Sequence, residues 1–203
     1  MPPNPQKTRE EMKSDIILAG VGGQGILSIA TVIGSAALEQ GLNLKQAEVH
    51  GMSQRGGDVQ SHLRLSDAPV HSDLIPLGGA DIIISMEPME ALRYLPFLAK
   101  DGWIITNTVP LKNIPNYPEM KEIEDALGKV KNVVAIDAEA AARAVMSPRS
   151  ANMVLLGACA GVLKILDPDK LRDGIRRIFG RKGEAIVEAN IKAFDAGIEL
   201  SKK

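Results

Sequence analysis

The chain has 203 residues, a length that suits a single domain of ordinary size. Lys and Arg together (24) nearly balance Asp and Glu (25), so no bulk charge attracts the protein to nucleic acid or to anionic lipid. No apolar run approaches the roughly 20 residues of a membrane-spanning helix, and the polar start lacks the apolar core of a signal peptide. We therefore expect a cytoplasmic protein with no nucleic-acid or membrane partner.

The cysteine content limits the redox chemistry of the chain. Cys159 is the single cysteine, so an internal disulfide is excluded. An iron–sulfur cluster normally takes about four thiolates, and the scattered histidines lack the spacing of zinc ligands. We expect that the chain holds no metal, and that Cys159, in a Gly- and Ala-rich segment, packs inside a helix that another helix approaches closely.

Short apolar runs alternate with segments of helical spacing along the chain. Residues 1–13 are predicted to be a disordered tail, and residues 14–203 one domain. The predicted strands cover residues 15–19, 45–50, 59–65, 81–85, 103–107 and 133–137. The predicted helices cover residues 24–40 and 88–99, an Ala-rich segment after residue 137, and residues 150 to about 166, 167 onward and 183–200, with Ser150 and Asp167 as caps.

Buried strands that alternate with helices indicate an α/β fold, with a largely parallel sheet covered on both faces. We therefore predict a Rossmann-like domain with a helical C-terminal segment from Ser150 onward. The strand at 59–65 alternates, which places Gln60, His62 and Arg64 on one face. That face could extend a polar site, but a solvated strand face is the commoner explanation.

The first strand runs into the sequence GVGGQG at residues 20–25 and then into a helix. Glycines allow the backbone to turn tightly and to approach a ligand, and the helix N-terminus offers free N–H groups to an anion. With Glu48 near the end of the second strand as a ribose-binding acid, the motif by itself is compatible with NAD or FAD. The alternative is a tight turn whose glycines only permit close packing, and the long Gln24 side chain weakens the dinucleotide interpretation.

A second glycine-rich loop follows the second strand, with the sequence EVHGMSQRGGD at residues 48–58. It brings a His, a Ser, a Gln and an Arg together among three glycines, which indicates special backbone angles or close approach of another chain. Both loops follow strand ends, so we expect them to face each other at a ligand crevice. A Ser53–His50 nucleophile pair is disfavoured because no orienting acid is identifiable.

With these two loops the chain resembles the gamma-type domain of the 2-oxoacid:ferredoxin oxidoreductases. GVGGQG with an RxG-containing loop is the general mark, and EVHGMSQRGGDVQSHLR is similar to the indolepyruvate branch, in which this domain is a separate beta subunit. The likeness extends through DIII at 81–84 with EPME at 87–90, then NT at 107–108, NM at 152–153 and KGE at 182–184. It covers essentially residues 14 to 200.

The resemblance implies an oxidoreductase subunit that is active only with an alpha subunit, in a hetero-oligomer. The implied reaction is the CoA-dependent oxidative decarboxylation of aryl pyruvates to aryl-acetyl-CoA, with reduction of ferredoxin. Thiamine diphosphate, magnesium and 4Fe–4S clusters are then expected on the partner, and CoA is a co-substrate. The alternatives are a stand-alone NAD-dependent dehydrogenase or nucleotide-binding protein that uses the GxGxxG loop, and a scaffold whose loops only bind the partner.

The candidate site residues come from the two loops. His50 could donate a proton or contact substrate, although a structural hydrogen bond is the more common role. Arg55 could pair with a substrate carboxylate, with CoA phosphate or with a carboxylate across the subunit interface. The residues predicted to shape or contact a cofactor or co-substrate are Gly20, Gly22, Gly23, Gln24, Gly25, Ser53 and Gln54.

Overall fold

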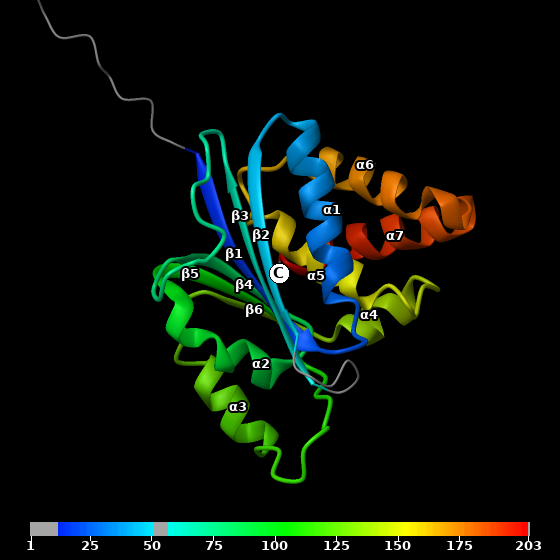
Figure 1. The fold of residues 1–203 in the computed structure, drawn as a ribbon. Coiled ribbons are helices and arrows are strands. Elements are labelled where there is room, and N and C mark those ends of the chain that lie inside the picture. The colour runs from blue at the N-terminus through cyan, green and yellow to red at the C-terminus, as the bar shows by residue number, and fades with distance from the viewer. Residues whose placement is uncertain (1–11, 51–56, 203) are drawn as a thin grey trace, which may run out of the picture.

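The structure is a computed structural model that describes residues 12–50 and 57–202 (Figure 1). Its centre is a six-stranded sheet with the strand order β2-β3-β1-β4-β5-β6. The strands are β1 (Lys13–Val21), β2 (Asn43–His50), β3 (Asp58–Ser66), β4 (Ala80–Ser85), β5 (Leu98–Asn107) and β6 (Val133–Ile136). The helices are α1 (Ile26–Glu39), α2 (Pro88–Arg93), α3 (Met120–Leu127), α4 (Ala138–Ala144), α5 (Ala151–Ala160), α6 (Pro168–Phe179) and α7 (Glu184–Leu200), with short 3₁₀ turns at Leu95–Phe97 and Gly180–Lys182.

The sheet is largely parallel, as predicted. β1, β4, β5 and β6 pair in parallel, whereas β3 runs antiparallel to both of its neighbours, β1 and β2. β2 and β3 therefore form a hairpin that adds to the edge of the parallel strands. The predicted helix at 24–40 and the strands at 15–19 and 81–85 are confirmed to within two residues at every end.

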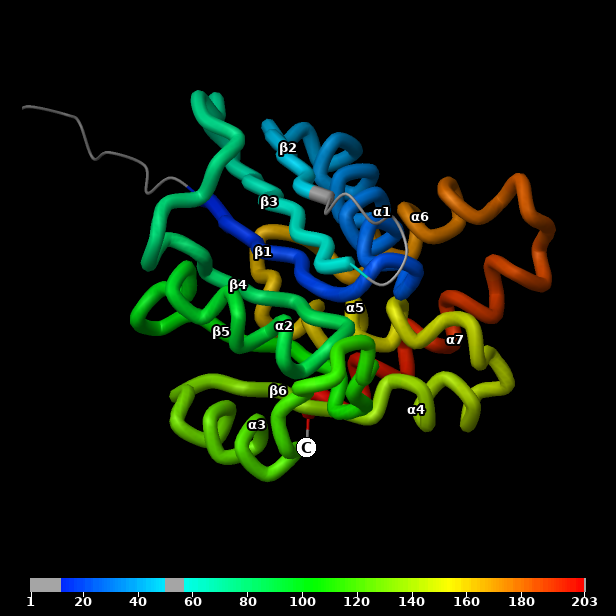
Figure 2. The backbone as a smooth tube through the Cα atoms, turned by 60° about the horizontal axis from the view of Figure 1, so that its bottom comes forward, coloured from blue at the N-terminus to red at the C-terminus, as the bar shows by residue number. Residues whose placement is uncertain are grey.

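Helices cover both faces of the sheet. The larger core packs β1, β3 and β4 against α1 and α4 to α7, while the smaller one lies between the other face and α2 and α3 (Figures 1 and 2). β1 alternates between them: Ile16 and Leu18 point into the larger core, and Ile17 and Ala19 into the smaller one. Burial of β1 on both sides explains its uninterrupted apolar run.

Two predicted helices are shorter than expected. The helix predicted at 88–99 ends at Arg93, because Pro96 cannot continue an α-helix and restrains the residue before it; a 3₁₀ turn follows. The helix predicted to run from Ser150 to about residue 166 ends at Ala160. Ser150 occupies its N-cap position but makes no capping bond, since its hydroxyl instead accepts from the Ser147 hydroxyl at 2.7 Å. The Asp167 cap is confirmed by a bond from the Asp169 N–H.

The expected solvated face of β3 is wrong. His62 is only 5% exposed, and its Nδ1 accepts a hydrogen bond of 3.0 Å from the Ile75 N–H. Arg64 pairs with Asp15 at 2.7 Å and donates to the carbonyls of Ser72 and Leu74. The segment 67–79 therefore folds back over this face, and the polar side chains hold it in place.

The packing role predicted for Cys159 is confirmed. Its thiol is fully buried in α5, and burial raises its pKa to about 12, so it is no nucleophile near neutral pH. Within the same helix, Gly157 lies against the α7 backbone, where an added Cβ would come 1.9 Å from the Phe194 carbonyl oxygen. None of the helices among the described residues is both long and apolar enough to span a membrane.

Candidate functional site at the carboxyl end of the sheet

The parallel strands all end at the same edge of the sheet, which lies just below the centre of Figure 1 and comes forward in Figure 2. From β1 the chain enters α1 on one face, and from the neighbouring β4 it enters α2 on the other face. The two connections diverge between β1 and β4, which makes this position the topological switch point. In open α/β sheets, ligands bind in the crevice outside the strand ends at such a point.

Gln24 fills that crevice with its own side chain. Its Oε1 accepts a 2.8 Å hydrogen bond from the Val21 N–H, and its Nε2 donates to the Met86 carbonyl at 3.3 Å. Gly20 leaves room for this amide, because a Cβ there would lie 3.0 Å from Gln24 Oε1. The amide thus links the end of β1 to the segment after β4, in the space where a dinucleotide fold places its phosphates.

In the rest of the glycine loop, Gly23 faces open space and Gly25 is fixed by its contact with α5. Gly23 has a φ of +102°, and a Cβ added there would meet no atom within 4 Å, so this residue faces free space. Gly25 has a φ of +78°, its carbonyl accepts from Asn152 Nδ2 at 3.1 Å, and a Cβ would meet that nitrogen at 2.9 Å. Both positions need glycine, Gly23 for its backbone angle and Gly25 also for its contact with α5.

The β2–β3 hairpin meets this loop. The Gly22 N–H donates to the Gly57 carbonyl at 2.9 Å, so the flanks of the two predicted loops lie side by side. His50 is the last residue of β2 and pairs with Val59, but its side chain lies outside the described part of the structure. Ser53, Gln54 and Arg55 also fall outside the described residues.

The position of Glu48 argues against a dinucleotide site. In a Rossmann fold the acid at the end of the second strand lies beside the first strand and binds the ribose. Here β3 separates β2 from β1, which places the two strands about 10 Å apart at two strand spacings. Glu48 is exposed and accepts from Gln46 Nε2 at 2.7 Å. The glycine loop and this acid therefore do not form a dinucleotide site.

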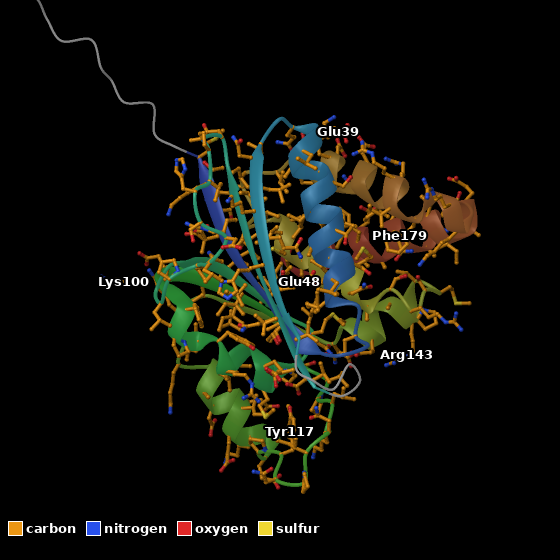
Figure 3. All side chains as sticks on the ribbon, viewed as in Figure 1. Glu39, Glu48, Lys100, Tyr117, Arg143 and Phe179 are labelled. Atoms are coloured by element: carbon orange, nitrogen blue, oxygen red, sulfur yellow. The ribbon has the colours of Figure 1, made fainter. Side chains whose placement is uncertain are left out.

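A pocket of about 560 Å³ opens beside the glycine loop. Its walls come from segments far apart in sequence, which α1, α5 and α7 bring together. They comprise Gly23, Gln24, Gly25 and Ser28, then Met146, Ser147, Pro148, Arg149, Ser150 and Asn152, and finally Phe179, Lys182, Ile186, Ala189 and Asn190. Figure 3 labels Phe179 on this side of the molecule.

The charges of the pocket favour an anion. Arg149 and Lys182 line it, no carboxylate does, and neither cation forms an ion pair with another residue in the described part of the chain. Lys182 instead lies 5.4 Å above the ring centroid of Phe179. The N-termini of α1 and α5 also open here, with no acidic residue in their first turns. Partial positive charge and two cations therefore coincide in one recess.

A buried polar network joins the loops on the other side of the switch point. Asn107 donates to the Met86 carbonyl at 3.3 Å and to Glu139 Oε1 at 3.2 Å. Glu87 is fully buried: its Oε2 accepts from the Glu90 N–H at 2.9 Å, and its Oε1 accepts from the Tyr117 hydroxyl. Because Tyr117 is partly buried and donates to this carboxylate, its pKa is raised and it stays neutral.

Sequence reasoning assigned no role to Asn107, Asn152, Arg149 or Lys182. Asn107 carried a usable signal, since it ends the apolar strand β5, as residues of a crevice do. Lys182 belongs to the KGE motif that carries part of the family resemblance, but nothing in a single sequence places it beside Arg149. The described residues include no group of three or more His, Cys, Asp or Glu that could hold a metal ion.

The fold and the site define an α/β domain in which the Gln24 side chain spans the topological switch point. An open pocket that favours anions lies beside the glycine loop. The model of the pyruvate ferredoxin/flavodoxin oxidoreductase family matches residues 15–200. The chain belongs to this family, as the sequence resemblance implied.

Relatives of known identity match the chain along nearly its whole length. It is 40% identical over 196 residues to the indolepyruvate oxidoreductase subunit IorB of Archaeoglobus fulgidus, covering 92% of this chain and 94% of that one. It is 37% identical over 198 residues to the subunit IorB of Pyrococcus horikoshii, covering 93% and 96%. The likeness to these two subunits therefore spans nearly the full length of both chains.

The fold is also found among solved structures. The gamma subunit of a keto/oxoacid ferredoxin oxidoreductase from Geobacter sulfurreducens superposes with a TM-score of 0.71 at 23% identity, over 94% of this chain and 97% of that one. The 2-oxoglutarate:ferredoxin oxidoreductase of Magnetococcus marinus gives a TM-score of 0.73 at 23% identity, over 94% of this chain but 31% of that one. The same fold thus occurs both as a separate chain and as part of a longer one.

Proposed function

We propose that this chain is the beta subunit of an indolepyruvate:ferredoxin oxidoreductase that works in the cytoplasm. The complex catalyses the CoA-dependent oxidative decarboxylation of aryl pyruvates to aryl-acetyl-CoA, and ferredoxin takes the electrons. The observation that carries the proposal is the 34–40% identity to four IorB subunits, each matched over more than nine-tenths of its length. A stand-alone dinucleotide enzyme is not supported, because Gln24 occupies the crevice that such an enzyme needs open.

The redox groups belong to the partner in this proposal. Thiamine diphosphate, with magnesium, supplies the carbanion chemistry, and 4Fe–4S clusters carry the electrons. The residues of this chain do not fit a cluster, because its single cysteine, Cys159, is fully buried in α5. We therefore assign these groups to the alpha subunit.

Within the complex this chain binds and orients. The pocket beside the glycine loop suits the phosphate end of CoA, because Arg149 and Lys182 can pair with phosphate oxygens. The apolar wall formed by Phe179 and Ile186 suits the less polar part of the same ligand. Gly23, Gln24 and Gly25 line the rim of this pocket.

The hairpin loop after β2 is proposed to reach the shared active site. Arg55 is assigned to pair with CoA phosphate or with a carboxylate across the subunit interface, and Ser53 and Gln54 to support it as donors. His50 is assigned to donate a proton or a hydrogen bond to substrate. What supports these roles is the Gly22–Gly57 hydrogen bond, which places the start of β3 against the glycine loop.

The test is reconstitution. The chain is co-expressed with the candidate alpha subunit, and viologen reduction is followed with several aryl pyruvates, with and without CoA. We expect turnover that needs both subunits and CoA, with none from either subunit alone. Activity from this chain by itself, or tight NAD binding in titration calorimetry, would refute the proposal.

Variants then assign the residues. Arg149→Ala and Lys182→Ala should raise the KM for CoA about tenfold each and leave the KM for the aryl pyruvate unchanged. Arg176→Ala is the matched control, since this arginine pairs with Asp173 on the exposed side of α6. His50→Ala and Arg55→Ala should lower turnover of the complex. If both leave it intact, the loop only binds the partner, as the scaffold alternative holds.

A further inference from the structure

The loop at residues 108–119 leaves the end of β5 and hangs from the same edge as the glycine loop (Figure 1). It contains prolines at 110, 115 and 118. Leu111 and Ile114 expose 41% and 37% of their surface, and Lys112 is the only charged residue between 108 and 118. Apolar, charge-poor composition at a surface is typical of the centre of a protein interface.

This loop is held from inside the protein. Glu87 lies just after β4, the strand next to β1, and is fully buried. Its Oε1 accepts a hydrogen bond from the Tyr117 hydroxyl and a longer one, 3.4 Å, from the Leu111 N–H. Figure 3 labels Tyr117 near the lower end of the molecule, below the ends of the parallel strands.

Holding the loop through the buried carboxylate of Glu87 costs free energy that a solvated loop would not require. No ion pair joins Glu87 to a cation in the described part of the chain, so hydrogen bonds alone offset the burial of its carboxylate. Burying a carboxylate without a counter-ion is expensive unless donors replace water. The benefit is a proline-stiffened loop with its aliphatic side chains already in position, and preorganisation of this kind strengthens association.

We propose that residues 108–119 form a docking arm for the alpha subunit, with Leu111 and Ile114 as its contact residues and Glu87 with Tyr117 as its positioning residues. This inference rests on the proposed function. The alpha subunit is the occupant because the arm leaves the same carboxyl edge of the parallel strands as the glycine loop, and this is the edge at which the partner is proposed to complete the site. Leu111 is hydrogen-bonded to Glu87 at the end of β4, beside the strand that carries the glycine loop.

The chain supplies its own matched control. Leu74 and Leu77 are 56% and 70% exposed, more than either residue of the arm. They lie in the segment that joins β3 to β4, at the opposite, amino end of the parallel strands. Substitutions there change at least as much exposed apolar surface without touching the proposed interface.

The experiment measures the affinity of the full chain for the purified alpha subunit by titration calorimetry. Leu111→Asp and Ile114→Asp should each weaken association about thirtyfold, the loss typical of a central contact residue. Leu74→Asp and Leu77→Asp should stay within about twofold of the wild type. Tyr117→Phe should weaken association about fivefold and speed amide exchange at 108–119, because it loosens the arm without changing its contact residues.

The outcomes separate this inference from the proposed function. Suppose that the wild-type complex forms and turns over, but Leu111→Asp and Ile114→Asp bind the alpha subunit with an affinity within twofold of the wild type. The docking arm is then refuted, and the proposed function is retained. Equal losses from Leu74→Asp also overturn the arm. If both arm variants instead abolish self-association of the isolated chain and spare the complex, the occupant is a second copy. Should either variant unfold, Leu111→Ser and Ile114→Ser replace them, with the same outcomes deciding.

Discussion

Replacement of Gly157 by alanine tests how closely α5 and α7 must approach. The two helices cross at a pair of glycines, Gly157 on α5 and Gly197 on α7. A Cβ at position 157 would lie 1.9 Å from the carbonyl oxygen of Phe194 and 3.1 Å from the amide nitrogen of Ile198. Both atoms are backbone, so neither can rotate away as a side chain would.

The magnitude follows from the required movement. Carbon and oxygen atoms approach to about 3.3 Å, so α7 must move away by about 1.4 Å. A gap of about 1 Å already forfeits up to half of the dispersion energy between packed atoms. Nine of the ten residues of α5 are buried, so the loss spreads over much of the larger core. We expect the free energy of unfolding to fall by about 3–5 kcal/mol, even after about 1 kcal/mol gained from the helix propensity of alanine.

Urea unfolding of the isolated chain measures this change. Gly161→Ala is the matched control, because Gly161 has a helical φ of −66° and an added Cβ would meet only Ser201 Oγ, at 3.8 Å. This variant should be about 0.5–1 kcal/mol more stable than the wild type. Gly157 lies within α5 and Gly161 at its C-cap, so propensity alone predicts the same sign for both.

The crossing also matters for the site. α5 and α7 carry Asn152 and Asn190, which both line the pocket. The Gly157→Ala variant, at a temperature where it remains folded, should therefore bind CoA more weakly in the complex. An unchanged urea midpoint for Gly157→Ala would refute the reasoning, since no relief of a 1.9 Å overlap can leave this core unaltered.

Three further changes probe the switch point and the covered face of β3. Gln24→Ala should lower the free energy of unfolding by about 1–3 kcal/mol in urea, because the Val21 N–H loses its part-buried acceptor and the Met86 carbonyl keeps only its donor from Asn107; an unchanged midpoint would contradict this role of Gln24. Gly25→Ala should cost about 1–2 kcal/mol in thermal unfolding, because φ is +78° there and Asn152 is close. Burial lowers the pKa of His62 from its ordinary value of 6.5, so the unfolded chain binds more protons below that pH. Stability should therefore fall as the pH drops from about 7 to 5, by at most about 1.4 kcal/mol per unit, and His62→Gln should flatten that slope.

Local signals were enough to predict most elements of this fold. The 3.6-residue spacing of Ile26, Ile29 and Ile33 identified α1, and the apolar run of β4 identified a buried strand. These signals depend on neighbours along the chain, and burial preserves them. Pro96 was an equally local signal for the early end of α2, and it was the one breaker that the predicted helix overlooked.

The pairing of the strands and the covering of β3 by the segment 67–79 could not be predicted from local signals. The alternation in β3 indicates that one face of the strand is buried. It does not identify the neighbouring strands or their direction, because side chains alternate every two residues in any pairing. The insertion of β3 between β1 and β2 was therefore not expected. The burial of His62 depends on the segment 67–79, which has no periodicity of its own and is fixed by contacts such as Arg64 to the Leu74 carbonyl.

In the candidate site, too, the features with a local signal were predictable and those made by long-range packing were not. Composition alone marked the glycine loop, and the Gly22–Gly57 hydrogen bond confirms that the hairpin lies against it. The pocket was not predictable, since it joins residues 23–28, 146–152 and 179–190 through helix packing. The roles of His50 and Arg55 remain predictions, because the residues that decide them lie outside the described structure.

The Gln24 plug explains how a GxGxxG loop can serve another chemistry. A dinucleotide pyrophosphate would have to displace an amide that satisfies both the Val21 N–H and the Met86 carbonyl, and it can accept hydrogen bonds but cannot donate one to that carbonyl. The exchange forfeits the Gln24 hydrogen bond to the Met86 carbonyl, which then keeps only the donor from Asn107, and this loss costs about 0.5–1.5 kcal/mol before any new contact forms. A ligand that stays outward, against Gly23 and the cations of the pocket, avoids this cost and still meets the N-termini of α1 and α5.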